Sequence, residues 1–305
     1  MRITKRLKSL LVAGLSQAMD GHQMQRLVRR VIPDYDLHER SGFPKSYPIQ
    51  AFDAATQVAI DTARDNVMTQ FIEVLIDVDR NGYMGRPISI HTLSEIIDEM
   101  EEQGFVFNEE YNVFVESRGG VQTIGWGVLR EGLSYELSFL SLDIVGNTKL
   151  VRKYPETKIA KAYNDVQRLV ALVVGRRDGR VWRWEGDGGL VAFYFGNKNV
   201  QATLTGMELL LELFMYNLFD CPFDEPLSVR VAVHTGPCQF FNSAKSIQNA
   251  TLARVIQIEA KHTEPNSMTI SRGVYTDLGA KLSSFFGQFE VSSRNFLYRY
   301  NLEWE

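Results

Sequence analysis

Two short segments of the sequence place an aspartate beside glycines at the end of an apolar run. The first is Asp143-Ile-Val-Gly-Asn-Thr148 and the second is Glu185-Gly-Asp-Gly-Gly189. Carboxylate oxygens are the ligands that Mg²⁺ prefers, and glycines leave backbone amides open to phosphate oxygens. The two aspartates are 187 − 143 = 44 residues apart. A pair of divalent cations carrying a triphosphate needs such carboxylates, so the segments predict a nucleotide-processing enzyme.

The residues that follow the first aspartate predict a seat for phosphate. Gly146, Asn147 and Thr148 lead from a strand into a helix. The free N–H groups at the start of a helix attract anions, and a preceding glycine lets a phosphate approach the backbone.

The pattern of apolar residues predicts the elements that hold these segments. Strands are expected at 137–142, 180–184, 190–195, 227–234 and 267–270, with 185–189 as a turn. Helices are expected at 148–174 (broken near Pro155), 200–219 and 251–261. This β-α-β-β-α-β order with additions predicts an α+β fold whose antiparallel sheet is covered on one face. The first strand of such a unit lies beside the hairpin, so Asp143 and Asp187 are expected at one edge of the sheet.

The first 130 residues have a different, mostly helical pattern. A basic amphipathic helix, or two short ones, is expected over 2–32, with further helices at 53–76 and 90–103. Alternation then predicts a hairpin of 105–107 with 113–115. A helix followed by a hairpin resembles a winged helix, but this helix is acidic and poorly suited to a DNA groove. The pattern favours a regulatory or interaction role for 1–130, and the glycine-rich segment 117–132 separates it from a second domain at 131–305.

The composition excludes several classes of protein. The 305 residues are 45% hydrophobic and 23% charged, and their net charge of −4 gives no reason to expect nucleic-acid binding. Two cysteines without metal spacing predict neither a disulfide framework nor a zinc site. The first apolar run is shorter than a signal peptide needs, and the longest one contains Glu212. We therefore expect a cytoplasmic protein without membrane contact.

Four ordered blocks of the sequence resemble the catalytic domain of class III nucleotidyl cyclases. Besides the two aspartate segments, they are Val229-Arg-Val-Ala-Val-His-Thr-Gly236 and Ala253-Arg254. The resemblance covers roughly residues 133 to 305. It implies a ferredoxin-like domain, a homodimer with active sites at the subunit interface, and two divalent metal ions (Mg²⁺ or Mn²⁺). It also implies that Asp143, Asp187 and the backbone carbonyl of Ile144 hold those ions. The implied reaction is attack of a ribose 3′-OH on the α-phosphate, with release of pyrophosphate.

The same resemblance suggests how the substrate is held. Arg254, on a helix that reaches the partner's site, is the candidate for stabilising the transition state, unless it only pairs with Glu259 on its own helix. The asparagine that the family usually has four residues earlier is replaced by Ala250, and Asn249 lies one residue before it. The lysine-rich phosphate loop of the family is replaced by a segment in which Arg294 is the candidate substitute.

The residue that reads the base differs from those of the purine cyclases. Arg183 stands where adenylyl cyclases have a lysine and guanylyl cyclases a glutamate. Arginine donates hydrogen bonds and accepts none, which suits a base with carbonyl oxygens. The pair of Tyr135 and Arg183 resembles the pyrimidine cyclases of bacterial anti-phage (Pycsar) defence. The alternatives are that Arg183 pairs with Glu185 and that Tyr135 only fills space in a strand.

The sequence thus predicts a lyase that converts UTP, slightly ahead of CTP, to cUMP or cCMP. The resemblance implies a second messenger that acts on a separate effector in phage defence. One alternative is a purine cyclase, and another is a cyclase-like domain that binds nucleotide without turnover and regulates a partner. A DNA-binding N-terminal half is a third alternative.

Overall fold

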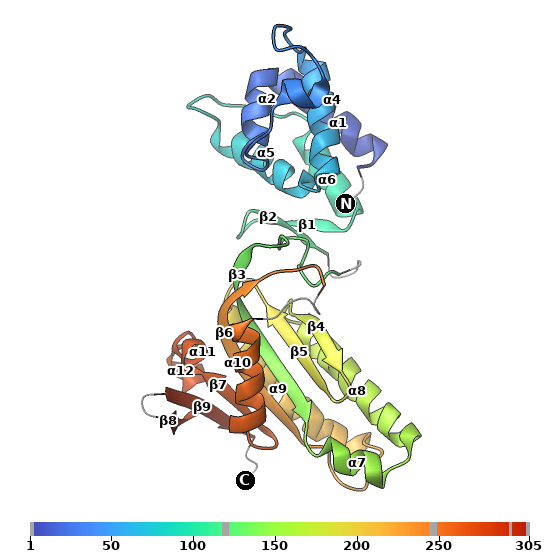
Figure 1. The fold of residues 1–305 in the computed structure, drawn as a ribbon, viewed down its shortest axis with the longest axis vertical. Coiled ribbons are helices and arrows are strands. Elements are labelled where there is room, and N and C mark those ends of the chain that lie inside the picture. The colour runs from blue at the N-terminus through green and yellow to red at the C-terminus, as the bar shows by residue number, and fades with distance from the viewer. Residues whose placement is uncertain (1–2, 118–121, 244–248, 293–294, 303–305) are drawn as a thin grey trace. The chain divides into compact units, whose positions relative to one another are not determined.

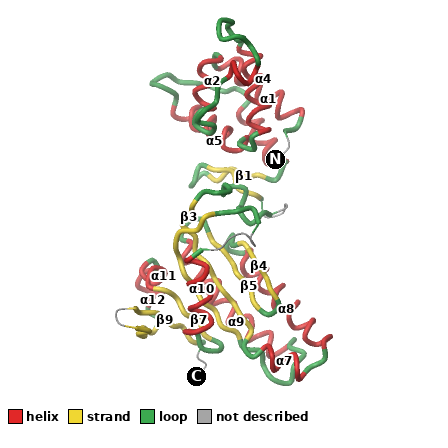
Figure 2. The backbone as a smooth tube through the Cα atoms, viewed as in Figure 1, coloured by secondary structure: helices red, strands yellow, loops and turns green. Residues whose placement is uncertain are grey.

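The computed structural model describes residues 3–117, 122–243, 249–292 and 295–302. The chain separates into two compact units, Met1–Val128 and Leu129–Glu305. Within the described residues, no helix combines the length and the apolar character that crossing a membrane requires. The strands are concentrated in the second unit, and the first is mainly helical (Figure 2).

The first unit contains six helices and one hairpin among its described residues. They are α1 (Lys5–Ala18), α2 (Gly21–Val28), α3 (Leu37–Ser41), α4 (Ala51–Arg64), α5 (Met68–Asn81), α6 (Leu93–Glu102), β1 (Phe105–Asn108) and β2 (Val113–Glu116). The Asp20 side chain accepts from the Gln23 N–H in a capping box, which begins α2. The segment 2–32, for which the sequence allowed either one helix or two, therefore contains two helices. The single helix predicted over 53–76 is wrong, because Asn66 adopts a left-handed φ of 55° between α4 and α5.

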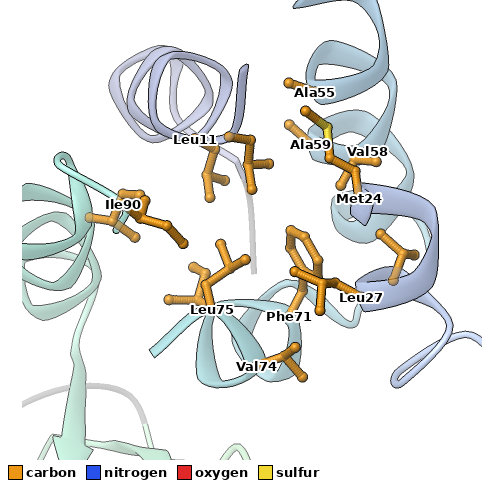
Figure 3. Close-up of a cluster of buried hydrophobic side chains, with 14 of the residues drawn as sticks. Leu11, Met24, Leu27, Ala55, Val58, Ala59, Phe71, Val74, Leu75 and Ile90 are labelled. Carbon is orange, nitrogen blue, oxygen red and sulfur yellow. The ribbon is translucent and has the colours of Figure 1, made fainter. Parts of the chain in front are cut away.

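Apolar side chains from several helices form the core of the first unit (Figure 3). Leu11, Leu27, Phe71 and Leu75 are fully buried there. Helical spacing places such residues on one stripe of each helix, and burying that stripe stabilises the unit.

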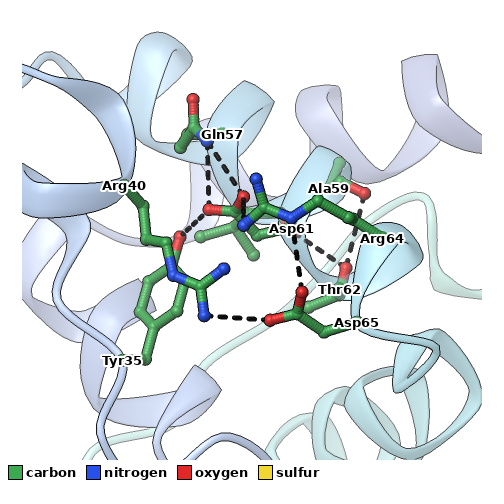
Figure 4. Close-up of polar contacts among 9 residues, drawn as sticks. Tyr35, Arg40, Gln57, Ala59, Asp61, Thr62, Arg64 and Asp65 are labelled. Atoms are coloured by element: carbon green, nitrogen blue, oxygen red, sulfur yellow. Dashed lines mark hydrogen bonds and ion pairs between the residues drawn. The ribbon is translucent and has the colours of Figure 1, made fainter.

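A carboxylate is also fully buried in this unit, and it is paired (Figure 4). Asp61 Oδ2 accepts from the Tyr35 hydroxyl at 2.9 Å, and Asp61 Oδ1 lies 2.8 Å from Arg64 Nη2. The Gln57 amide donates to both oxygens at 3.0 Å. Burial and the Asp61 carboxylate raise the pKa of Tyr35. A buried charge is tolerated only with such partners, so Asp61 ties the segment before α3 to α4.

The second unit is built on one seven-stranded sheet with the order β4-β5-β3-β6-β7-β9-β8 (Figure 1). Its strands are β3 (Ser134–Ile144), β4 (Arg180–Glu185), β5 (Gly188–Phe193), β6 (Val229–Gln239), β7 (Ser267–Ser271), β8 (Gly287–Ser292) and β9 (Asn295–Asn301). Only β6 and β7 pair in parallel, and the other neighbours are antiparallel. With two intervening helical segments, β3 to β6 form the β-α-β-β-α-β unit, so the predicted α+β class is confirmed.

Helices pack on both faces of this sheet. They are α7 (Asn147–Lys153), α8 (Glu156–Gly175), α9 (Lys198–Phe219), α10 (Ala250–His262), α11 (Arg272–Thr276) and α12 (Gly279–Ser283). A Cβ on Gly206 of α9 would meet Val231 and Leu140, whereas Glu259 of α10 pairs with Arg230. Successive strand residues point to opposite faces, so α9 and α10 lie on opposite sides (Figure 1). The prediction that helices cover only one face is therefore wrong. The break at Pro155 is confirmed, because it separates α7 from α8.

Candidate active site

The two predicted aspartates lie next to each other at one end of β3. Asp143 is in register with Gly188 on β5, the residue that follows Asp187. The Ile144 N–H donates to the Asp187 carbonyl at 3.2 Å. Both aspartates line a hollow of about 160 Å³. Pairing of β3 with the β4–β5 hairpin thus brings together carboxylates that are far apart in the chain.

Gly188 permits this close approach. A Cβ at this position would lie 2.9 Å from the backbone oxygen of Leu142 and 3.3 Å from Asp143 Oδ1. The backbone oxygen belongs to a paired central strand and has little freedom to move. A side chain at 188 would therefore separate the two carboxylates.

Two further charged groups, for which the sequence predicted no role at the aspartates, lie beside them: Glu259 lines the hollow, and Arg230 contacts Asp143. Arg230 Nη2 lies 2.5 Å from Asp143 Oδ2, and Arg230 Nε lies 2.8 Å from Glu259 Oε1. The second contact lacks the alignment of a hydrogen bond. Burial raises the pKa of Glu259 to about 7, and the charges of Asp143 and Asp187 act in the same direction, against the opposing guanidinium. This imperfect pairing does not offset burial, and the hollow carries an excess of negative groups.

The residues at this edge fit divalent cations that arrive with a triphosphate. Among the described residues, no three His, Cys, Asp or Glu side chains form a metal site by themselves. Mg²⁺ in phosphate-processing sites uses one or two carboxylates and takes its other ligands from phosphate and water. The Asp143 side chain keeps 26% of its surface exposed, so its carboxylate can be reached. Asp143 and Asp187 would hold the ions, and the carbonyl of Ile144 stays a predicted third ligand.

The turn that is predicted to bind phosphate contacts Tyr163, a residue for which the sequence predicted no role. Gly146 has a left-handed φ of 75° and precedes α7, a helix of seven residues. The Tyr163 hydroxyl, from α8, donates to Asn147 Oδ1. Burial, followed by the charges of Asp187 and Asp143, raises the pKa of Tyr163. Tyr163 therefore lies near both carboxylates and orients the Asn147 amide. Thr148 is exposed, and the phosphate role of this turn stays a prediction.

The structure separates the two residues predicted to read the base. Arg183 lines the hollow, with its Nε 3.5 Å from Glu185 Oε1. Tyr135 is eight residues before Asp143 on β3, or about 26 Å along the strand. Its hydroxyl accepts from the Arg130 N–H at 2.9 Å. Tyr135 and Arg183 do not meet within one chain, and Arg183 makes the ion pair that the sequence left open as an alternative.

Arg254 and Asn249 are not among the residues that line the hollow. Arg254 donates to Gln257 Oε1 at 2.8 Å and does not pair with Glu259. Five residues along a helix correspond to a rotation of about 140°, so Arg254 and Glu259 lie on different sides of α10. Asn249 caps α10, where its Oδ1 accepts from the Leu252 N–H at 2.9 Å. Arg294 lies outside the described residues.

His234, on β6, is a partly buried histidine whose hydrogen bond and altered pKa have a measurable consequence. Its Nδ1 lies 2.8 Å from Ser271 Oγ. Burial, followed by the charge of Arg254, lowers the pKa of His234 to about 4. The unfolded chain binds a proton on this imidazole near pH 6.5, so its stabilising contribution is complete above pH 6.5 and is lost as the pH falls towards 4.

We expect the free energy of unfolding to fall by about 2 kcal/mol between pH 7 and pH 5 because of this one histidine. Urea denaturation of the full chain and of His234→Gln at both pH values measures the effect as a difference between the two proteins. An equal pH dependence in both would contradict it.

Part of the chain is similar in fold to solved structures of nucleotide cyclases. The guanylyl cyclase Cya2 matches with 20% identity and a TM-score of 0.49, over 56% of this chain and 93% of that chain. The adenylyl cyclase CyaB from P. aeruginosa matches with 17% identity and a TM-score of 0.47, over 57% and 96%. An adenylate/guanylate cyclase/hydrolase from Silicibacter pomeroyi matches with 17% identity and a TM-score of 0.48, over 56% and 99%. No family model and no curated protein matches the sequence.

Proposed function

We propose that the chain is a nucleotidyl cyclase that converts a nucleoside triphosphate to its 3′,5′-cyclic monophosphate and pyrophosphate. The observation that carries the proposal is the meeting of Asp143 and Asp187 around one hollow, next to the Gly146 turn. In this reaction the ribose 3′-oxygen forms a bond to the α-phosphorus. The bond from that phosphorus to pyrophosphate breaks, and the hydroxyl proton passes to water.

The chain's own groups position the substrate. Divalent cations bound by the two carboxylates would neutralise phosphate charge and lower the pKa of the attacking hydroxyl. The backbone at Gly146 to Thr148 would seat phosphate oxygens. Arg254 does not line the hollow of its own chain, so the transition-state role that the resemblance gives to Arg254 would have to be supplied by Arg254 of a second copy. This need supports a homodimer with active sites at the interface.

The finer proposal is that the base is a pyrimidine, UTP ahead of CTP. Arg183 lines the hollow and offers donors only, which suits the carbonyl oxygens of uracil or cytosine. Its contact with Glu185 is long, at 3.5 Å, and the side chains are 36% (Arg183) and 69% (Glu185) exposed, so a base can compete for Arg183. A role in phage defence through a separate effector, with 1–130 as the regulatory region, completes the proposal.

Incubation of the full chain with ATP, GTP, CTP and UTP in turn, with Mn²⁺, tests this function. We expect a cyclic pyrimidine monophosphate to form about tenfold faster than cyclic AMP or cyclic GMP, a difference of about 1.4 kcal/mol in the barrier. Cyclic AMP or cyclic GMP as the main product would identify a purine cyclase instead.

One observation favours a non-catalytic alternative. Asp143 already has a cation partner, since the Arg230 guanidinium lies 2.5 Å from its Oδ2. If that pair excluded metal ions, the domain would bind nucleotide without turnover and regulate a partner. Nucleotide binding without product from any of the four triphosphates would support this alternative.

A further inference from the structure

The two oxygens of Asp143 have different surroundings. Oδ2 lies 2.5 Å from Arg230 Nη2, a charge-assisted hydrogen bond that fixes this oxygen. Oδ1 lies on the side of β5, 3.3 Å from the point where a Cβ on Gly188 would be. The carboxylate is thus held by one oxygen, and the other faces the turn that carries Asp187.

Arg230 is itself held in place from two directions. It is the register partner of Asp143 on β6, so both side chains rise from the same face of the sheet. On its other side, its Nε lies 2.8 Å from Glu259, which is only 5% exposed on α10. Three elements therefore fix the guanidinium.

We propose that Arg230, held on its other side by Glu259, is a positioning residue that turns Asp143 Oδ1 towards the cation site. The proposal rests on the proposed function, because it assumes that Asp143 binds a divalent cation. A lone arginine would repel that cation, but the ionised form of Glu259 offsets the guanidinium charge. The pair can then orient Asp143 at little electrostatic cost, and Asp143 offers the cation one oxygen. Groups that orient metal ligands in this way contribute about 10- to 100-fold in affinity.

Mn²⁺ binding to the full chain without nucleotide, measured by electron paramagnetic resonance, tests the role of Arg230 independently of turnover. Arg230→Gln is expected to bind Mn²⁺ about tenfold more weakly, because Asp143 loses its anchor. A purely electrostatic role gives the opposite sign, since removal of a positive charge strengthens cation binding. Arg230→Lys keeps the charge but loses the planar fork, so it is also expected to weaken binding.

A second arginine provides a matched control. Arg299 pairs with Glu264, and its side chain is 20% exposed, compared with 25% for Arg230. Arg299→Gln is expected to lower the melting temperature as Arg230→Gln does, but to bind Mn²⁺ as the wild type does. This comparison separates positioning from a general loss of stability.

Two outcomes would overturn the inference. Mn²⁺ affinity in Arg230→Gln that equals or exceeds that of the wild type, while Asp143→Asn loses binding, would remove the positioning role and leave the cation site. Unchanged affinity in Asp143→Asn would remove the site itself. Failure of the proposed cyclase activity is distinguishable from both, because the wild type would then bind Mn²⁺ but form no cyclic product.

Discussion

Asp187→Ala is expected to lower the rate of cyclic nucleotide formation at least about 1000-fold. The substitution removes one of two carboxylates at the hollow, and a fixed cation beside a phosphate that gains charge is worth several kcal/mol of barrier. Each 1.36 kcal/mol of lost stabilisation corresponds to tenfold in rate. Product formation measured at saturating triphosphate and Mn²⁺ gives the comparison.

Glu185→Gln is the matched control for this prediction. Glu185 precedes the same turn and lines the same hollow, but its side chain is 69% exposed and contacts only Arg183 among the ion pairs of the described residues. We expect a loss of a few fold at most, because a single exposed ion pair contributes about 0–1 kcal/mol. Equal rates in wild type and Asp187→Ala would contradict the catalytic assignment and favour the regulatory alternative.

Gly188→Ala is expected to reduce the rate about 100-fold without unfolding the chain. The added Cβ would meet the Leu142 oxygen at 2.9 Å, so the strand or the turn must shift by several tenths of an ångström. Small displacements of reacting groups have effects of about this size. The same strain is expected to destabilise the fold by about 1–3 kcal/mol. Steady-state kinetics and thermal unfolding measure the two effects separately.

Gly175→Ala controls for the loss of a glycine elsewhere in the same unit. Gly175 ends α8, and a Cβ there would meet nothing within 4 Å. Alanine is expected to leave the rate unchanged. A Gly188→Ala protein as active as Gly175→Ala would show that the close approach of β5 to Asp143 is not required.

The sequence predicts the sheet topology of the second unit better than the contacts in its site. Alternating apolar runs and Pro155 are local signals, and they correctly predict the first five strands of the sheet, β3 to β7, and the break before α8. Topology alone then brings Asp143 beside Asp187. The last two strands, β8 and β9, were not predicted, because their apolar patterns are short and their side chains are partly exposed.

Contacts that depend on strand register could not be predicted from the sequence. Arg230 meets Asp143 because two antiparallel strands align at those positions, and a shift of one residue would turn the guanidinium to the other face. The pairing of Tyr163 with Asn147 likewise depends on how α8 packs. The pair of Tyr135 and Arg183 resembles the pyrimidine cyclases in sequence. Their separation along the sheet depends on the strand register, so the sequence did not predict it. The break at Asn66 was missed because the apolar periodicity continues through it.

Asp143 and Asp187 lie in backbone segments that differ in how readily they unfold locally. From Ser138 to Asp143, β3 is paired with strands on both sides and its side chains are largely buried. Backbone amides in such a segment exchange their hydrogens with solvent only when most of the unit unfolds. Asp187 follows Gly186, whose φ is 59°, in the tight connection between β4 and β5. Asp143 is therefore anchored in a segment expected to exchange its hydrogens slowly, while Asp187 lies on a hairpin tip, which would let it adjust to a phosphate in the proposed reaction.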